Sequence, residues 1–234
     1  MNILLICDDY WHPGQVSIDG VAPLAKDGYQ FDIISNANDF SPETLKKYSI
    51  VLLVKCDQTS QTDETPWKTE TVQKAFIEFV ENGGGLVVIH SGTVAGKNTE
   101  ALDKLIGCRF IDHPNACPVT VSPIKPHPIT KGVEIFCETD EHYNIEIIAD
   151  DIDVLLASYS PAQGEESKYK EDPYHNCPEA LYPAGYVRTQ GKGKVCVLTP
   201  GHNLAVWQNP QFQQLLANTI KWITPPSTMA VGRG

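Results

Sequence analysis

The chain has 234 residues, of which 41% are hydrophobic and 20% are charged, and its formal net charge is −11 at pH 7. This size and composition predict a single α/β domain over residues 1–224, followed by a flexible tail at residues 225–234. The acidic charge argues against nucleic acid or an anionic membrane surface as a partner. No apolar stretch approaches the roughly 20 residues that a membrane-spanning helix needs.

The cysteines and the N-terminus together indicate a compartment. The seven cysteines are widely spaced and include no C-x-x-C pair, which is typical of reduced and mostly buried thiols. The first residues meet Asp8 and Asp9 too early for a signal peptide. We therefore expect a cytoplasmic protein.

Residues 1–107 alternate between apolar runs and helical patterns. Strands are expected at residues 3–7, 31–35, 50–54 and 86–90. Helices are expected at residues 15–26, 42–47, 69–81 and 99–106. Such alternation predicts a doubly wound parallel sheet with right-handed crossovers.

The second half of the chain changes character. Short strands are expected at residues 119–123, 134–137 and 154–159, with an antiparallel pair at residues 182–188 and 194–199. A polar loop at residues 161–179 is a candidate lid, and an amphipathic helix at residues 210–223 ends the domain. The expected fold class is therefore α/β, with a mostly parallel sheet and antiparallel additions in the C-terminal half.

Three histidines lie at or shortly after the ends of expected strands, namely His12, His90 and His202. Parallel strands end at the same edge of an α/β sheet, so these imidazoles are expected to lie together. They could hold zinc or another first-row divalent ion, with a carboxylate as fourth ligand or general base. The alternative is a cluster that binds a polar ligand by hydrogen bonds without metal.

The densest ionisable cluster of the chain is Asp140-Glu141-His142-Tyr143. Glu141 is a candidate general acid/base or metal ligand, and Tyr143 a candidate hydrogen-bonding partner of a substrate. A solvated turn is the alternative for this segment.

Further candidate substrate contacts lie near the expected strand ends. Asp9 and Trp11 belong to a polar and aromatic loop after the first strand, and His113 could point back into the same cleft. The ring faces of Trp11 and Trp207 would suit the apolar face of a sugar, although core packing is the alternative. The glycines at residues 83–85 precede their strand, so we expect no nucleotide cofactor.

Eight short blocks, in this order, resemble the trehalose-utilisation (ThuA-like) family. The blocks are GGGLVVIH (83–90), LIGCRF (105–110), HP (113–114), HPIT (127–130), DEHY (140–143), RTQGKGKV (188–195), GH (201–202) and W-x-x-P-x-F (207–212). The resemblance implies a flavodoxin-like sheet similar to the class I glutamine amidotransferase domain. In that domain the elbow after the equivalent strand carries a nucleophilic cysteine, but here the position holds His90, and His202 matches the late histidine. The resemblance therefore does not imply a cysteine-dependent glutaminase.

The same family is associated with the breakdown of disaccharides and related glycosides, including keto-sugar intermediates. The resemblance thus implies a protein that acts on a small-molecule carbohydrate by acid–base chemistry, with Glu141, His90 and His202 as catalytic residues. The alternative is a non-catalytic sugar-binding or regulatory protein on the same scaffold. Assembly into a homo-oligomer is compatible with either reading.

Overall fold

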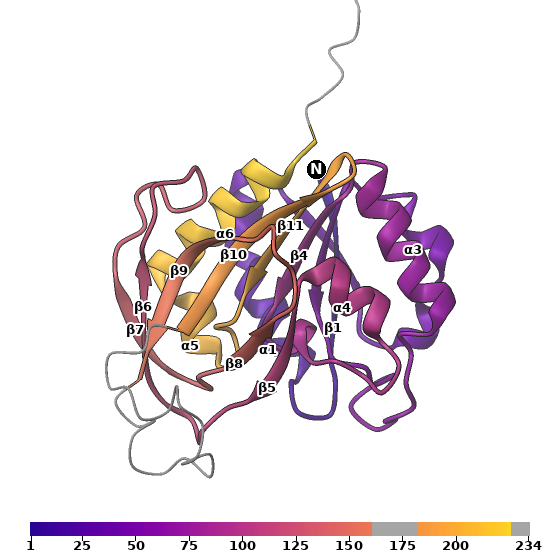
Figure 1. The fold of residues 1–234 in the computed structure, drawn as a ribbon, viewed down its shortest axis with the longest axis horizontal. Helices are drawn as coiled ribbons and strands as arrows, with labels where there is room; N and C mark the ends of the chain where they lie inside the picture. The colour runs from indigo at the N-terminus through magenta and orange to yellow at the C-terminus, as the bar shows by residue number, and fades with distance from the viewer. Residues whose placement is uncertain (161–181, 226–234) are drawn as a thin grey trace, which may run out of the picture.

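A nine-stranded sheet forms the centre of the molecule, in a computed structural model that describes residues 1–160 and 182–225 (Figure 1). Its strands are β1 (Asn2–Cys7), β2 (Gln30–Ile34), β3 (Ile50–Val54), β4 (Gly85–Ile89), β6 (Cys117–Pro123), β7 (Phe136–Asp140), β9 (Asp153–Tyr159), β10 (Tyr182–Gln190) and β11 (Gly193–Leu198). They lie in the order β2-β1-β3-β4-β11-β10-β9-β6-β7.

Five neighbouring strands make up the parallel part of this sheet. β1 pairs in parallel with β2 and β3, while β4 pairs in parallel with β3 and β11. Every residue of β3 and β4 is buried, as expected for parallel strands that helices cover on both faces. The order β2-β1-β3-β4-β11 is that of a flavodoxin-like sheet, so the expected fold class is confirmed.

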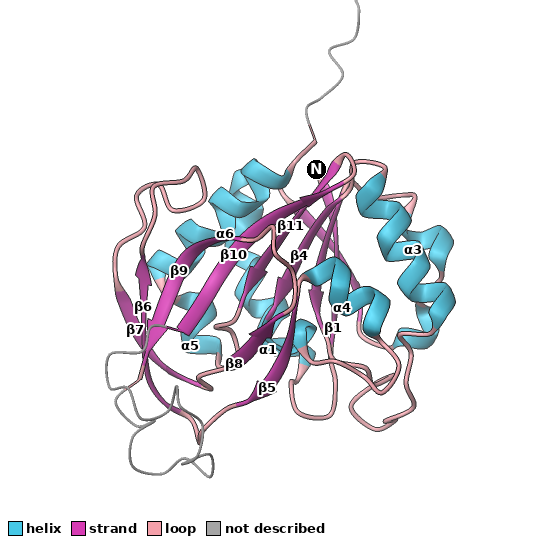
Figure 2. Ribbon diagram, in the orientation of Figure 1, coloured by secondary structure: helices cyan, strands magenta, loops and turns pink. Residues whose placement is uncertain are grey.

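Helices cover both faces of the parallel strands (Figure 2). They are α1 (Gly14–Val21), α2 (Pro42–Leu45), α3 (Glu70–Glu81), α4 (Glu100–Ile106), α5 (Leu204–Gln208) and α6 (Pro210–Ile223). α1, α5 and α6 pack on one face, and α3 packs with α2 and α4 on the other. Because successive strand residues point to opposite faces, Ile3 and Leu5 join the first core, whereas Leu4 and Ile6 join the second.

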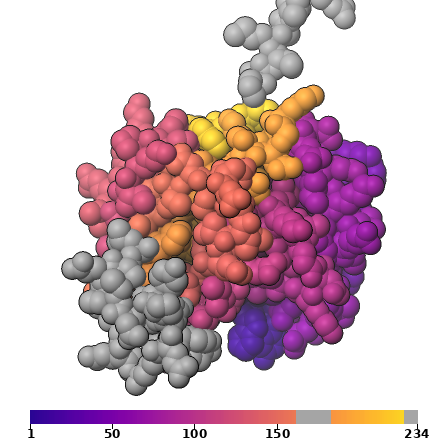
Figure 3. Space-filling model, in the orientation of Figure 1, coloured from indigo at the N-terminus to yellow at the C-terminus, as the bar shows by residue number. Residues whose placement is uncertain are grey.

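The C-terminal half adds antiparallel strands. β10 pairs antiparallel with β11 and β9, and β6 pairs antiparallel with β9 and β7. A separate antiparallel pair consists of β5 (Cys108–Asp112) and β8 (Asn144–Ile147), neither of which was expected. In Figure 3 the early segments, indigo to magenta, occupy one side of the molecule and the later segments, red to orange, the other.

Several expected boundaries differ from the structure, and three of the differences bear on the argument. The helix expected at residues 15–26 divides into α1 and a 3-10 helix at Ala22–Asp27, because Pro23 cannot donate the hydrogen bond that would continue an α-helix. β4 ends at Ile89, so His90 begins the short 3-10 helix η3 (His90–Thr93). β7 begins later than expected and runs to Asp140, which places Glu141 directly after a strand.

The candidate lid at residues 161–179 and most of the expected tail lie outside the described residues. Within residues 1–160 and 182–225, every helix is too short or too polar to cross a membrane.

Candidate active and metal site

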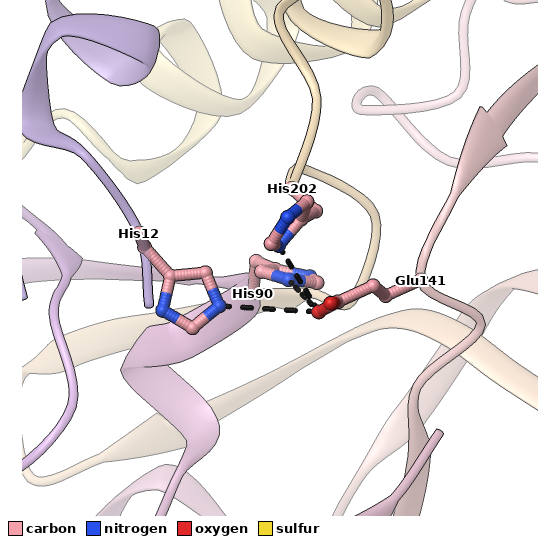
Figure 4. Close-up of side chains that lie close together, drawn as sticks. All are labelled: His12, His90, Glu141 and His202. Carbon is pink, nitrogen blue, oxygen red and sulfur yellow. Dashed lines mark hydrogen bonds and ion pairs between the residues drawn. The ribbon is translucent and has the colours of Figure 1, made fainter. Parts of the chain in front are cut away.

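Three imidazoles meet at the C-terminal edge of the parallel strands. His12 follows β1, His90 follows β4, and His202 follows β11. The ring centroids are 5.1 Å apart for His12 and His90, 5.2 Å for His12 and His202, and 5.4 Å for His90 and His202. The expectation that these three residues lie together is confirmed (Figure 4).

The backbone at His90 is strained. Its φ of 47° lies in the left-handed region, which non-glycine residues rarely adopt. The following turn is tight, because a Cβ atom on Gly92 would lie 2.3 Å from the carbonyl oxygen of Leu53. This elbow turns the chain sharply at the end of β4 and holds the buried His90 ring inside the site, and strain of this kind clusters at functional sites.

One carboxylate oxygen faces all of these imidazoles. Oε2 of Glu141 lies 3.0 Å from Nδ1 of His202, 3.3 Å from Nε2 of His90 and 4.0 Å from Nε2 of His12. A fourth imidazole, His113, approaches the same oxygen with its Nε2 at 3.5 Å. Glu141 is thus the centre of the cluster (Figure 4).

In three imidazoles, the nitrogen that faces away from Glu141, Nδ1, contacts a group that can only accept a hydrogen bond. These acceptors are Oδ1 of Asp9 at 2.7 Å from Nδ1 of His12, the carbonyl of Thr199 at 2.8 Å from Nδ1 of His90, and the carbonyl of Pro114 at 2.8 Å from Nδ1 of His113. Each Nδ1 therefore carries the proton and donates it. In the neutral ring, Nε2 then carries a lone pair and no proton. All three Nε2 atoms lie within 4.0 Å of Oε2 of Glu141, and that of His12 also lies 3.2 Å from the hydroxyl of Tyr143.

Lone pairs that face a carboxylate repel it unless a positive charge lies between them. Burial lowers the pKa of His90, so this ring favours the neutral form. The hydrogen bond to Glu141 raises the pKa of His202 although burial opposes it. Burial by itself would raise the pKa of Glu141, but its interactions with the rings of His202 and His90 outweigh this effect and hold the pKa well below its usual range. Without metal, His202 is therefore the imidazole of this cluster whose charged form Glu141 favours.

The same donors fit a metal ion. Nitrogen atoms of His12, His90 and His202 and one oxygen of Glu141 all lie within 4.8 Å of one another. Imidazole and carboxylate are ligands typical of zinc and other first-row divalent ions. The contact of His12 with Asp9 is also the carboxylate–histidine arrangement that fixes metal-binding imidazoles in proteins.

Asp9 lies behind the His12 ring and is too buried to make the direct substrate contact that we expected. It is 0% exposed, and its carboxylate accepts hydrogen bonds from the backbone N–H groups of Trp11, His12 and Cys56 in addition to the His12 ring. Burial raises the pKa of Asp9, but the hydrogen bond and charge of His12 outweigh this effect and lower the pKa to about 2. The ionised carboxylate thereby fixes both the loop and the His12 ring.

Tyr143 lies in the site as its position beside Glu141 suggested. Its ring stacks on His90 with centroids 3.7 Å apart, and its hydroxyl lies 3.2 Å from Nε2 of His12. Burial raises the pKa of Tyr143 well above its ordinary value, so the phenol keeps its proton as a donor. Asp140 and His142 are each 1% exposed. The alternative of a solvated turn at residues 140–143 is therefore wrong.

The two tryptophans differ. Trp207 is 0% exposed and donates a hydrogen bond from Nε1 to the carbonyl of Gly201, so it is a core residue, and the expected contact with a sugar is wrong. Trp11 is 66% exposed and packs edge-on against Tyr10 in the loop that carries His12. Most of its side chain is therefore exposed to solvent.

Cysteine does not supply the nucleophile at the elbow. Burial raises the pKa of Cys56, whose backbone N–H donates to Asp9, to about 12, so this thiol stays protonated. All six cysteines of the described residues are free thiols, and five of them are buried.

Sequence reasoning missed several groups that shape the site. Thr199 and Pro114 act through backbone carbonyls, for which no side-chain pattern exists. The carboxylate of Asp140 accepts hydrogen bonds from the loop that carries His202, and only its place beside Glu141 in the sequence pointed to it.

Comparisons with known proteins agree with this fold. The chain matches the ThuA family, described as trehalose utilisation, over residues 4–223. No curated protein matches the chain. A ThuA-like protein from Bacteroides uniformis is similar in structure, with 21% identity, a TM-score of 0.67, and coverage of 95% of this chain and 91% of that chain. A ThuA-like protein from Parabacteroides merdae gives 19% identity, a TM-score of 0.71, and coverage of 96% and 90%.

A more distant likeness is to part of a larger enzyme. A β-galactosidase from Rahnella sp. R3 has 16% identity and a TM-score of 0.60, and the match covers 93% of this chain but 31% of that one. At such identities these structures show the fold alone. The family match spans almost all of the sheet and its helices, and its description indicates a role in sugar metabolism. The chain belongs to the ThuA (trehalose utilisation) family.

Proposed function

We propose that this protein acts on a sugar, glycoside or keto-sugar derivative by acid–base chemistry at the cluster around Glu141, assisted by a divalent metal ion. The observation that carries the proposal is the convergence of four imidazole nitrogens on one carboxylate oxygen, those of His202 and of three rings whose other nitrogen already faces an acceptor. Such a set of acceptors binds either protons or a metal cation. The family description supports a carbohydrate as the substrate.

His12, His90 and His202 would hold the ion, and Glu141 would either complete the ligand set or act as the general base beside it. A bound divalent ion would supply Lewis-acid polarisation of a substrate oxygen. A carbonyl group in the substrate acidifies the neighbouring C–H, which brings its proton within reach of a carboxylate base.

The same proposal gives each remaining residue of the cluster a role. Oε2 of Glu141 takes the proton, because it is the acceptor at the centre of the cluster. The hydroxyl of Tyr143 and the exposed edge of His113 hold substrate hydroxyl groups, since both face the cluster. The ring of Trp11 packs against the apolar face of the sugar.

Metal content tests the first part of the proposal. We expect elemental analysis of the protein purified without an affinity tag to find about one first-row divalent ion per chain. Substitution of His12 by Gln should remove the ion, whereas substitution of His127, which packs against Trp222 away from the cluster, should not. Wild-type protein that binds no divalent ion even when titrated with zinc or manganese would contradict metal assistance.

Proton exchange tests the second part. In D₂O, the protein should exchange the C–H proton next to the carbonyl of a keto-disaccharide, as followed by proton NMR. Glu141→Gln keeps the size of the side chain but cannot take a proton, so exchange should slow by about 10²–10⁴-fold. If Glu141 is a ligand, the same substitution lowers metal occupancy first. Saturable binding of the sugar with no exchange and no turnover would instead support the non-catalytic alternative.

A further inference from the structure

The end of β7 is joined to the segment that follows β11 by four consecutive residues. Nδ2 of Asn209 donates to Oε1 of Glu138 at 2.8 Å, and Nδ2 of Asn203 donates to the carbonyl of Thr139 at 2.9 Å. Asp140 accepts from three backbone N–H groups. Oε2 of Glu141 lies 3.0 Å from Nδ1 of His202. Two of the four candidate metal ligands, Glu141 and His202, therefore lie on the two segments that these contacts join.

Asp140 makes the densest of these contacts. Its side chain is buried, with 1% of the residue exposed. Oδ2 accepts a hydrogen bond from the N–H of Gly201 at 2.8 Å, and Oδ1 accepts from the N–H groups of His202 at 2.9 Å and Asn203 at 3.3 Å. One carboxylate thus collects three successive donors of the loop between β11 and α5, and a buried carboxylate requires such donors.

We propose that Asp140 is a positioning residue that holds His202 against Glu141. Asp140 fixes the backbone of residues 201–203 relative to β7, and the next residue of the chain, Glu141, meets the His202 ring. Two neighbouring residues, Asp140 and Glu141, therefore fix how far the His202 ring lies from the Glu141 carboxylate. The consequence of this contact for metal binding and turnover rests on the proposed function, whereas the positioning itself rests on the geometry alone.

Asp140→Asn is the direct test, because the amide replaces one acceptor oxygen by a donor that faces backbone N–H groups. The matched control is Asp103→Asn, which makes the same change in a carboxylate that is 5% exposed and contacts Thr99 and Arg109 instead of the site. We expect Asp140→Asn to weaken binding of Zn²⁺ or Co²⁺ by about 10–100-fold, as substitutions behind metal ligands typically do. Asp103→Asn should leave the affinity within about twofold.

A double-mutant cycle separates positioning from a general structural effect. If Asp140 acts through His202, Asp140→Asn should cost little further affinity in a His202→Ala background. The visible spectrum of the Co²⁺ protein should also change in the same way in Asp140→Asn as in His202→Ala. An undiminished loss of affinity in the His202→Ala background, or no loss in the wild-type background, would overturn the proposal.

A metal-independent measurement keeps the proposal testable if the wild-type protein binds no metal. In metal-free protein, the imidazole ¹⁵N signals of His202 should move in Asp140→Asn as they do in Glu141→Gln, while those of His127 stay in place. Unchanged His202 signals would overturn the positioning role without touching the proposed function. If Asp140→Asn does not fold, amide exchange in the wild-type protein replaces it, because the N–H groups of residues 201 and 202 must then be protected, and rapid exchange there would contradict the proposal.

Discussion

At the scale of single residues, the site is defined by which atom of each ring faces inward. Three imidazoles donate Nδ1–H to fixed acceptors, and this choice leaves three Nε2 lone pairs directed at Glu141. A sequence names the histidines but does not contain their tautomers, since the acceptors are a buried carboxylate and two backbone carbonyls. The protonation of the imidazoles is thus set by the groups behind them, namely Asp9 and the carbonyls of Thr199 and Pro114.

A substitution at Asp9 would test this dependence on the groups behind the imidazoles. Asp9→Asn removes the charge that fixes the His12 ring and places an amide donor near N–H groups that need an acceptor. We expect affinity for zinc to fall by about 10–100-fold. Calorimetric titration would measure the loss, with Asp103→Asn as the control. Unchanged affinity would mean that His12 is not a ligand.

The raised pKa of His202 predicts how the stability of the metal-free protein depends on pH. The pKa of His202 is raised in the folded protein, so its contribution is fully present below its unfolded pKa of about 6.5 and is lost as pH rises through the folded pKa. The free energy of unfolding should therefore fall over this window, by at most about 1.4 kcal/mol per pH unit for one proton.

Urea unfolding at a series of pH values would measure this slope, with EDTA present. His202→Gln should flatten it. His127→Gln should not, because burial lowers the pKa of His127 and its contribution has the opposite sign. A slope that survives in His202→Gln would assign the titration to another group.

At the scale of elements, prediction from sequence succeeded where a segment carries its own pattern. β3 matched its expected bounds, and α3 and α6 were predicted from their amphipathic spacing to within one residue. β5 and β8 were missed because they are short strands that pair with each other across more than thirty residues of sequence. α5 has only five residues and is held by its neighbours, so it too lacks a local pattern.

The elbow after β4 is an element whose geometry requires glycine. A Cβ on Gly92 would meet the carbonyl oxygen of Leu53 at 2.3 Å, whereas one on Gly132, at φ 71°, would meet nothing within 4 Å. Gly92→Ala should therefore destabilise the protein by about 1–3 kcal/mol or more, since overpacking forces the backbone to move. Gly132→Ala should cost only about 1 kcal/mol, for backbone strain.

Chemical denaturation of both variants would compare these costs. Because Gly92 lies two residues after His90, Gly92→Ala should also weaken metal binding, and Gly132→Ala should not. Equal stability of the two variants would contradict the close approach of β3 to the elbow.

At the scale of the whole molecule, the four central donors come from loops after β1, β4, β7 and β11, so they are brought together only when the sheet is complete. The rule that parallel strands end at one edge was enough to predict the meeting of His12, His90 and His202. It could not place Glu141, which follows an antiparallel strand at the far end of the strand order. The burial of Trp207 could not be predicted either, because sequence spacing does not show how deeply a side chain is buried.

Because the donors span residues 12–202, binding of a metal ion should stabilise the entire fold and not one segment. A ligand that binds only the folded state adds RT ln(1 + [L]/Kd), about 2.7 kcal/mol at a concentration of 100 Kd. We expect the Tm to rise with added zinc or manganese and to fall again with EDTA. In a His12→Gln/His202→Gln double variant this rise should disappear, whereas His127→Gln should keep it. Since unfolding of any one of the four loops disperses the ligand set, an equal rise of Tm in the double variant would place the bound ion outside this cluster.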